Sequence, residues 1–419
     1  MRTIPILLLG LTAAFSAGAA AQVLGPVGRT VGAVGGVVDG VTGPVLDPLA
    51  ERTGALLSNV RQLAADRVSR LTTLVQRNRD TLEFDDRGNP AVRGEVLGVD
   101  ISTAGIEAAR KAGFTLIDQS EIGDLGIRTA RFAPPEGMSL RRALKAIRKA
   151  APGEWTANQL HFESSAATLP TAGLLAASQP AGAARIGMID GGIGQHPSLS
   201  GPIEQRGFVV SAPQPSAHGT AIAALMVGKG SFPGVLPGAP LLAADVYGKT
   251  PVGGNALAIA QAIGWMTGRR VPVISISLVG PSNPLLAKTV AAARVRGTFI
   301  VAAVGNDGPA APPAYPASYP GVIAVTGVDG RNRALIEAGR ALHLDYAAPG
   351  ADMLGAKPGG GTVNLRGTSY AAPLVAARLV ALPSPSVAAL DREAIDLGKR
   401  GPDKIYGRGL VCGQCRIKP

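Results

Sequence analysis

The chain has 419 residues, which is long enough for two or three domains. Hydrophobic residues make up 46% of it and aromatic residues only 4%, and 41 Lys and Arg against 29 Asp and Glu give a net charge of +12. The basic residues are scattered and few aromatic side chains could stack on bases, so nucleic-acid binding is not expected. The positive charge leaves room for a weak association with an anionic envelope surface.

Residues 1–21 predict a signal peptide. Arg2 precedes an apolar run over about residues 4–15, and Ala19 and Ala21 stand before Gln22 in an A-x-A cleavage pattern. The run is short for a transmembrane anchor, and its far end consists of small residues. The protein is therefore expected to be exported to the periplasm or the extracellular space.

Three further segments precede the main part of the chain. Residues 22–45 are a low-complexity Gly/Val/Pro segment, and residues 46–79 carry a weakly amphipathic helical pattern, so 22–93 is treated as one N-terminal arm. Residues 94–163 alternate strands and helices in the order β-α-β-β-α-β, with Ser102 and Ser139 as helix caps. This split βαβ order predicts a small α+β domain.

Residues 164–182 are small, polar and punctuated by proline, which is typical of a linker. Beyond them, short apolar runs such as ARIGMID and FIVAAVG alternate with helical patterns such as GNALAIAQAIGWMTG. Uninterrupted apolar runs are typical of parallel strands buried on both faces. Residues 183–411 are thus predicted to form an α/β domain, a parallel sheet flanked by helices, with its chemistry at the carboxyl ends of the strands.

Three reactive groups stand just past a strand or at a helix start. Asp190 ends RIGMID, His218 begins HGTAIAALMVG, and Ser369 is expected to open the helix of GTSYAAPLVAA. Taken singly, they are better explained as a turn residue, a buried structural histidine and a helix cap. Together they supply a nucleophile, a base and the carboxylate that orients the base. Asn306, in a turn-like GNDG after a strand, would donate to the developing oxyanion.

The order Asp, His, Ser and the motifs MIDGG, HGTAIAAL, AAVGNDG and GTSYAAP resemble the subtilisin-like serine peptidases, or subtilases, over about residues 183–411. The resemblance implies that Ser369 is the nucleophile, His218 the general base and then acid, Asp190 the orienting carboxylate and Asn306 the oxyanion donor. Residues 94–163 resemble a subtilase propeptide. They are expected to inhibit the enzyme and aid its folding in cis, until cleavage somewhere in residues 163–182 removes them.

The resemblance also implies that an extended peptide pairs with strand edges beside the pocket for the residue before the cut bond. The residues expected to flank this pocket are Ser277, Leu278, Val279, Gly280, Ala302, Ala303, Val304 and Gly305. Three positions depart from the family pattern. Gly191 replaces a Ser or Thr that would support the aspartate, Ala221 replaces a frequent second His, and Val279 replaces a Gly, which would narrow the pocket and favour small side chains.

The tail, residues 412–419, contains Cys412 and Cys415. In an exported chain this spacing favours a small disulfide, because a zinc half-site would need further ligands nearby. No cofactor or metal ligand set is evident; structural calcium is common in the family, but no acidic cluster identifies a site. The remaining histidines, His161, His196 and His343, match no motif and are expected to be structural or at the surface.

The expected function is that of a secreted, self-processing serine endopeptidase that acts on polypeptides as a monomer. One alternative is a catalytically weak relative that binds peptides or serves as a scaffold in the envelope through its N-terminal arm. A second is a serine esterase, but an esterase of the α/β-hydrolase kind would show G-x-S-x-G and the order Ser, Asp, His, and this sequence shows neither.

Overall fold

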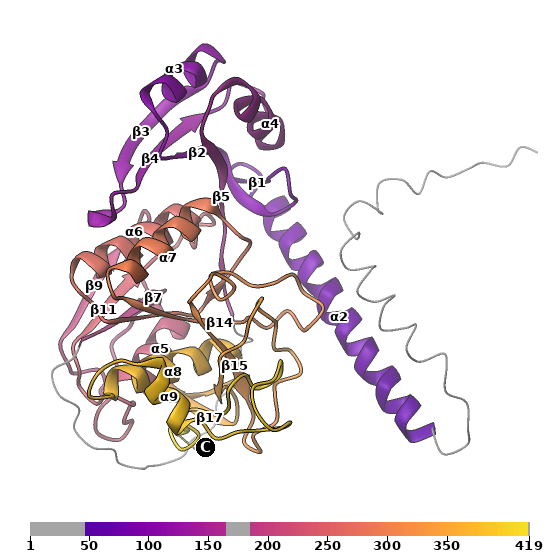
Figure 1. Ribbon diagram of the computed structural model, residues 1–419, viewed down its shortest axis with the longest axis vertical. Helices are drawn as coiled ribbons and strands as arrows, with labels where there is room; N and C mark the ends of the chain where they lie inside the picture. Colours follow the sequence, from indigo (N-terminus) through magenta and orange to yellow (C-terminus); the bar gives the residue numbers. More distant parts are fainter. Residues whose placement is uncertain (1–46, 165–184, 418–419) are drawn as a thin grey trace, which may run out of the picture.

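The computed structural model describes residues 47–164 and 185–417, with side chains from residue 58 onward. A long helix leads into a small domain, which sits on top of a larger one (Figure 1). The predicted signal peptide, the low-complexity segment and most of the predicted linker lie outside the described residues. Among the described helices, none combines the length and the apolar character needed to cross a membrane.

The small domain is an antiparallel sheet covered by two helices on one face. The strand order is β1-β2-β4-β3, with β5 paired to the other side of β2. The predicted order β-α-β-β-α-β is present, and the short strand β1, which was not predicted, precedes it. The N-terminal elements are α2 (Asp47–Arg77), β1 (Leu82–Phe84), β2 (Pro90–Val99), α3 (Thr103–Lys111), β3 (Thr115–Glu121), the 3₁₀ turn η1 (Gly123–Leu125), β4 (Arg128–Ala133), α4 (Leu140–Ala150) and β5 (Glu154–Gln159).

The two predicted helix caps differ in outcome. Ser102 caps α3, and its side chain accepts a hydrogen bond from the Gly105 N–H. Ser139 stands at the cap position of α4, but its side chain makes no capping bond. The buried carboxylate of Glu83 in β1 accepts the Leu140 N–H instead, at 3.0 Å, so a strand that the sequence did not reveal supplies this cap.

The main domain is built on a parallel sheet of seven strands in the order β16-β15-β14-β12-β7-β11-β9. Each neighbouring pair in it is parallel, as the apolar runs predicted. Its elements are β7 (Ile186–Asp190), β8 (Gly192–Ile193), β9 (Ile203–Gly207), β10 (Pro215–Ser216), α5 (Ala217–Val227), β11 (Leu241–Asp245), α6 (Ala256–Gly268), β12 (Val273–Ile276), β13 (Leu278–Val279), α7 (Pro284–Val295), β14 (Phe299–Ala303), β15 (Ile323–Val328), β16 (Tyr346–Pro349), β17 (Met353–Ala356), β18 (Thr362–Leu365), α8 (Thr368–Ala381) and α9 (Val387–Glu393).

Helices cover both faces of this sheet, with α6 and α7 on one side and α5 and α8 on the other (Figure 1). Successive side chains of a strand point to opposite faces. In β14, Val301 and Ala303 accordingly pack in the core with α5 and α8, and Ile300 and Ala302 pack in the core with α6 and α7. The sequence has no amphipathic alternation here because both faces are covered.

The small domain and the main domain share one hydrophobic core. Strand β2 and the connection between β3 and β4 contribute buried residues to the cluster that includes α6 and α7; they are Leu97, Val99, Ile122, Leu125 and Ile127. Polar contacts join the same surfaces. The Asn158 side chain of β5 accepts the Leu257 N–H near the start of α6, and Asn283, the cap of α7, donates to the Ala157 carbonyl. The small domain thus accepts one N–H at the start of α6 and anchors the side chain that caps α7.

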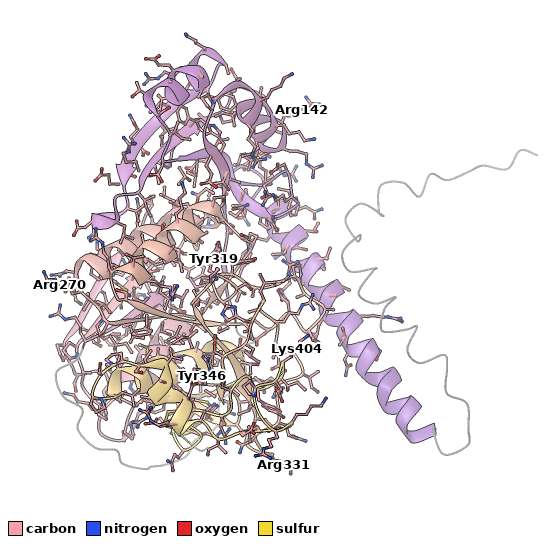
Figure 2. All side chains as sticks on the ribbon, viewed as in Figure 1. Arg142, Arg270, Tyr319, Arg331, Tyr346 and Lys404 are labelled. Carbon is pink, nitrogen blue, oxygen red and sulfur yellow. A yellow bond between two sulfur atoms is a disulfide. The ribbon has the colours of Figure 1, made fainter. Side chains whose placement is uncertain are left out.

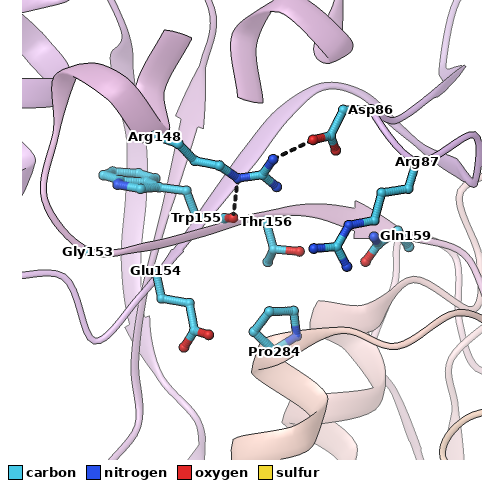
Figure 3. A pocket seen from close by; sticks show the side chains of 9 residues that line it. All are labelled: Asp86, Arg87, Arg148, Gly153, Glu154, Trp155, Thr156, Gln159 and Pro284. Atoms are coloured by element: carbon cyan, nitrogen blue, oxygen red, sulfur yellow. Dashed lines mark hydrogen bonds and ion pairs between the residues drawn. The ribbon is translucent and has the colours of Figure 1, made fainter. Parts of the chain in front are cut away.

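A cavity of about 250 Å³ remains at the edge of this interface (Figure 3). It lies between α4, β5 and the Pro284 end of α7, and Arg148 beside it donates to Asp86 and to the Trp155 carbonyl. None of Asp190, His218, Asn306 and Ser369 lines it.

Buried aromatic and exposed basic side chains occupy different parts of the molecule. Tyr319 and Tyr346 are buried in the main domain, whereas Arg142, Arg270, Arg331 and Lys404 project outward from separate parts of the molecule (Figure 2). The positive charge is therefore spread out rather than gathered on one face. In the tail, Cys412 and Cys415 form the predicted disulfide.

Candidate active site

Asp190 and His218 form a buried hydrogen-bonded pair. Asp190 is the last residue of β7, and His218 is the second residue of α5, whose cap Ser216 accepts the Gly219 N–H. The imidazole Nδ1 lies 2.8 Å and 3.0 Å from the two carboxylate oxygens of Asp190. The Gly191 N–H also donates to this carboxylate, at 2.8 Å. The carboxyl end of β7 thus positions the carboxylate of Asp190, and the start of α5 positions the imidazole of His218.

Two opposing effects act on the pKa of His218. Burial lowers this pKa, but the charge and hydrogen bond of Asp190 raise it, with a further contribution from Glu163, and the net result is a raised pKa. A carboxylate at Nδ1 that stabilises the imidazolium is what a general base needs when it accepts a proton at Nε2.

Ser369 lies in the first turn of α8, but it does not cap this helix. The helix begins at Thr368, and the cap position is Gly367, whose φ of 143° falls in the region that favours glycine. Ser369 is therefore the second residue of the helix, one position after the residue that opens it and two after the cap. The Ser369 Oγ and the His218 Nε2 are both buried and have no hydrogen-bond partner among the described residues. The ring of the next residue, Tyr370, packs 5.3 Å from that of His218.

Asn306 follows β14 and links the start of α8 to the cleft. Its Oδ1 accepts the Thr368 N–H at 3.0 Å, which orients the amide so that Nδ2 faces the other way. Nδ2 donates to the carbonyl oxygen of Ser164, and the Ser369 N–H donates to the same oxygen at 3.3 Å. Two donors from separate elements therefore converge on one peptide carbonyl.

That carbonyl belongs to residues 160–164, here called the cleft segment, which lies extended between two parts of the main domain. On one side β6 (Phe162–Glu163) pairs antiparallel with β13, and the Ser164 N–H donates to the Ser277 carbonyl at 3.2 Å. On the other side the His161 N–H donates to the Gly254 carbonyl at 2.7 Å. The cleft segment thus adds a strand in the manner of a bound peptide.

The eight residues predicted to flank the pocket occupy two neighbouring places. The first four follow the cleft segment: Ser277 donates to the Ser369 carbonyl at 2.8 Å, and Leu278, Val279 and Gly280 run beside Phe162 and His161. Of the others, Ala302 and Ala303 are buried within β14, and Val304 and Gly305 continue from it. A Cβ on Gly305 would lie 3.3 Å from Val279 Cγ1, so these two residues face each other closely.

Three groups in the cleft were not predicted from the sequence. The Glu163 side chain is 37% exposed, and its Oε1 lies 3.9 Å from His218 Nδ1. Partial loss of solvent around this carboxylate, together with the charges of Asp190 and Asp245, raises the pKa of Glu163 to about 7, against the opposing effect of His218. The hydroxyl of Tyr247 donates to the His161 carbonyl at 3.0 Å. His161 itself is fully buried, and burial lowers its pKa to about 4. Nothing in the local pattern distinguishes these residues from ordinary polar positions.

The departures at Gly191 and Ala221 have local explanations. A Cβ on Gly191 would lie 2.7 Å from Ser216 Cβ and Oγ, so the helix cap fills the space that a side chain at 191 would need. Ala221 is buried, and a Cβ on Gly355 of β17 would lie 2.9 Å from its Cβ. A larger residue at either position would need its neighbours to shift.

Among the described residues, one group of three could offer ligands to a metal ion, namely Glu163, Asp190 and His218. It does not suit calcium, which takes about six to eight oxygen ligands. A metal at His218 Nδ1 would also displace the hydrogen bond to Asp190.

Comparison with known proteins agrees with this geometry. Residues 182–393 match the subtilase family, described as Peptidase_S8. The chain is 34% identical over 245 residues to Subtilisin Savinase of Lederbergia lenta, covering 54% of this chain and 88% of the relative. It is also 34% identical over 245 residues to an alkaline protease of Alkalihalobacillus alcalophilus, covering 54% and 62% of the two chains.

A likeness in fold extends further along the chain. Fervidolysin from Fervidobacterium pennivorans, described as a keratinolytic enzyme related to subtilisin, superposes with a TM-score of 0.63 at 19% identity and covers 78% of this chain and 61% of its own. This coverage exceeds what the main domain alone would supply. The family match and the Asp190–His218 pair lead to one conclusion. The chain belongs to the subtilase family and is a subtilisin-like serine endopeptidase.

Proposed function

We propose that the protein is the precursor of an exported endopeptidase in which Ser369, His218, Asp190 and Asn306 carry the catalysis. The observation that supports this most directly is the carbonyl oxygen of Ser164, which accepts hydrogen bonds from the Ser369 N–H and the Asn306 amide. Two such donors stabilise the oxyanion of acyl transfer. The start of α8 adds a positive partial charge at the same place.

In the proposed mechanism the Ser369 Oγ attacks the peptide carbonyl carbon while His218 Nε2 takes the hydroxyl proton. The proton then passes to the leaving amine, the C–N bond breaks, and the N-terminal product remains as an ester on Ser369. Water hydrolyses this ester with His218 again as the base. Asp190 accepts the Nδ1–H throughout, which fixes the tautomer and stabilises the imidazolium.

The first substrate is the chain itself, cut between Ser164 and Ser165. Residues 160–164 already pair with the cleft as a substrate would, and the carbonyl of Ser164 lies against the two oxyanion donors. This narrows the predicted range of 163–182 to one bond. The small domain would then act as the enzyme's own propeptide, since Ile122 and Leu97 are buried in the cluster that includes α6 and α7 of the main domain.

Export is supported by the signal-peptide pattern of residues 1–21. The disulfide between Cys412 and Cys415 suits an oxidising compartment such as the periplasm or the extracellular space.

The test compares purified full-length protein with its Ser369→Ala variant. The native protein should react with a fluorophosphonate and yield a labelled band whose N-terminal sequence begins at Ser165. Ser369→Ala should give neither result, because loss of the nucleophile costs roughly a thousandfold or more in rate. Ser386→Ala, a change at the cap of the surface helix α9, is the matched control and should behave like the native protein.

Two results would count against this assignment. Cleavage at Ser165 by purified Ser369→Ala would exclude the triad. A native protein that binds peptides but is neither labelled nor cleaved would support the catalytically weak scaffold instead.

A further inference from the structure

The N-terminal helix α2 contacts the main domain immediately beside the oxyanion donor. It runs from β1 down the side of the main domain, and its N-terminal end points away from the small domain (Figure 1). The residue after Asn306 is Asp307, and its carboxylate pairs with Arg67 Nε at 3.1 Å and with an Arg70 guanidinium nitrogen at 2.5 Å. These two arginines are one turn apart on α2, so both reach the same carboxylate.

An apolar contact accompanies the ion pairs. A Cβ built on Gly308 would lie 3.0 Å from Leu63 Cδ1, which means that Leu63 packs directly on the backbone at Gly308. The positive φ of Gly308, 80°, lets this loop present a bare backbone surface to the helix. The loop after Asn306 is therefore held by one charged and one apolar contact from α2.

The other end of α2 packs against the cleft segment. Val75 forms a hydrophobic cluster with Leu82 of β1 and Leu160 of the cleft segment, and Leu74 and Phe162 pack against it. Val252 of the main domain borders the same cluster. The helix thus contacts the segment that fills the cleft through its C-terminal end, and the loop that carries the oxyanion donor through its middle.

We propose that α2 is part of the inhibitor, so that the unit that blocks the cleft begins within α2 rather than at residue 94. The loop Asp307–Gly308 is the docking surface. Its partner is α2 of the same chain, which supplies the two arginines that pair with Asp307 and, one turn away, Leu63. After cleavage at Ser164 the released segment would dissociate slowly because α2 holds it at this second surface. This inference rests on the proposed function above.

The experiment follows release of activity in purified full-length protein. Self-processed protein is diluted, and hydrolysis of a peptide substrate is recorded until the activity is constant; the initial activity is expressed as a fraction of this final value. Normalising each variant to its own final activity removes any effect on catalysis itself. N-terminal sequencing checks that processing at Ser165 has occurred.

Charge reversal of the two arginines is the decisive change. Arg67→Glu with Arg70→Glu should weaken retention of the inhibitor and raise its release rate by about tenfold, since two attractive pairs become repulsive. High salt should speed release in the native protein and have less effect in this variant. Arg61→Glu, at an exposed position on the same helix, is the matched control and should release activity at the native rate.

A third variant tests the pairing directly. Asp307→Lys alone should also speed release, and combining it with Arg67→Glu and Arg70→Glu should restore slow release. If the arginine variant behaves like Arg61→Glu, while both are still labelled and cleaved at Ser165, the role of α2 is overturned and the peptidase assignment stands. If no variant is labelled or cleaved, the proposed function itself has failed.

Discussion

Glu163 sits where its charge acts on the catalytic base. Its Oε1 lies 3.9 Å from His218 Nδ1, and its carboxylate is one of the groups that raise the pKa of His218; the other is Asp190. Glu163 also belongs to the segment that we propose is cut, so under this proposal its influence exists in the precursor and ends when that segment leaves the cleft. Self-processing and later catalysis should therefore differ in their dependence on pH.

Replacing Glu163 with Gln should shift self-processing to lower pH. The base must be neutral to accept the Ser369 proton, and a nearby negative charge raises the pKa of His218, so removal of this charge lets His218 lose its proton at lower pH. Because the pKa of Glu163 is itself about 7, its charge is present mainly above neutral pH, so the acid limb of the processing rate should move down by less than about one pH unit. The rate of appearance of the Ser165 terminus between pH 5 and 9 measures this.

Two comparisons make the result specific. Glu121→Gln, at an exposed carboxylate in β3, should leave the profile unchanged. The mature enzyme acting on a peptide in trans should show the same profile whether it came from native or Glu163→Gln precursor. An unchanged processing profile for Glu163→Gln would mean that its charge does not reach the base.

At the scale of elements, the cleft is bounded by β13 and by the end of β14, and their separation determines what fits. Val279 lies 3.3 Å from the position of a Gly305 Cβ, so these two edges nearly touch. The residue of the cleft segment that precedes the proposed cut is Ser164, which is small and 2% exposed, and its Oγ donates to the Ser277 carbonyl at 3.0 Å. The close approach of Val279 to Gly305 and the small residue at 164 lead us to expect a preference for small side chains before the cut bond.

Val279→Gly should widen this preference. Removing the side chain opens space opposite Gly305, so kcat/KM for peptides with Phe or Leu before the cut bond should rise by about tenfold or more relative to Ser or Ala. The measurement uses mature enzyme and a peptide series that varies only at that residue. Val252→Gly, which removes the same side chain at the other border of the cleft segment, is the control. An unaltered preference in Val279→Gly would place the pocket elsewhere.

The elements of the main domain were predictable because the local signals agree with the fold. The apolar runs form parallel strands. Asp190 is the last residue of one such strand, β7, and lies at the carboxyl end of the sheet, where catalytic groups are expected. The predictions failed where the determining contact is distant in sequence. The cap of α4 comes from Glu83, and the predicted strand WTANQLHF divides into β5 and β6 because its last residues pair with β13 in the other domain.

In the candidate site, too, the residues with a local motif could be predicted and those that depend on distant contacts could not. Asp190, His218, Asn306 and Ser369 could be proposed because each has a motif around it, and the hydrogen bond between the first two is present. Glu163 and Tyr247 have no motif, since their positions depend on where the cleft segment lies. Neither could the ion pairs of Asp307 be foreseen, because their partners on α2 are more than two hundred residues away, at separations of 240 and 237.

For the whole molecule, the shared core explains why the two domains would need each other during folding. The parallel sheet joins strands far apart in sequence, which makes folding slow because loop closure precedes the stabilising contacts. The small domain has a separate core of its own around Phe132 and Trp155. It can offer a preformed apolar face on which α6 and α7 settle.

The variant Ile122→Asp in the full-length chain should test this role. Ile122 is fully buried in the core that includes α6 and α7, and an unpaired charge there is costly. Recovery of active enzyme after dilution from denaturant should fall by about tenfold or more, since a loss of about 1.4 kcal/mol of interaction between the two domains corresponds to a tenfold change in population. Ile117→Asp, the same substitution at an exposed position in β3, should refold like the native protein.

The enzyme that does form from the Ile122→Asp precursor should have native kcat/KM, because the proposed cleavage removes residue 122 from the mature chain. This separates an effect on folding from an effect on catalysis, which no substitution within the main domain could do. Equal recovery of Ile122→Asp and Ile117→Asp would mean that the main domain reaches its fold unaided, and that the small domain contributes inhibition alone.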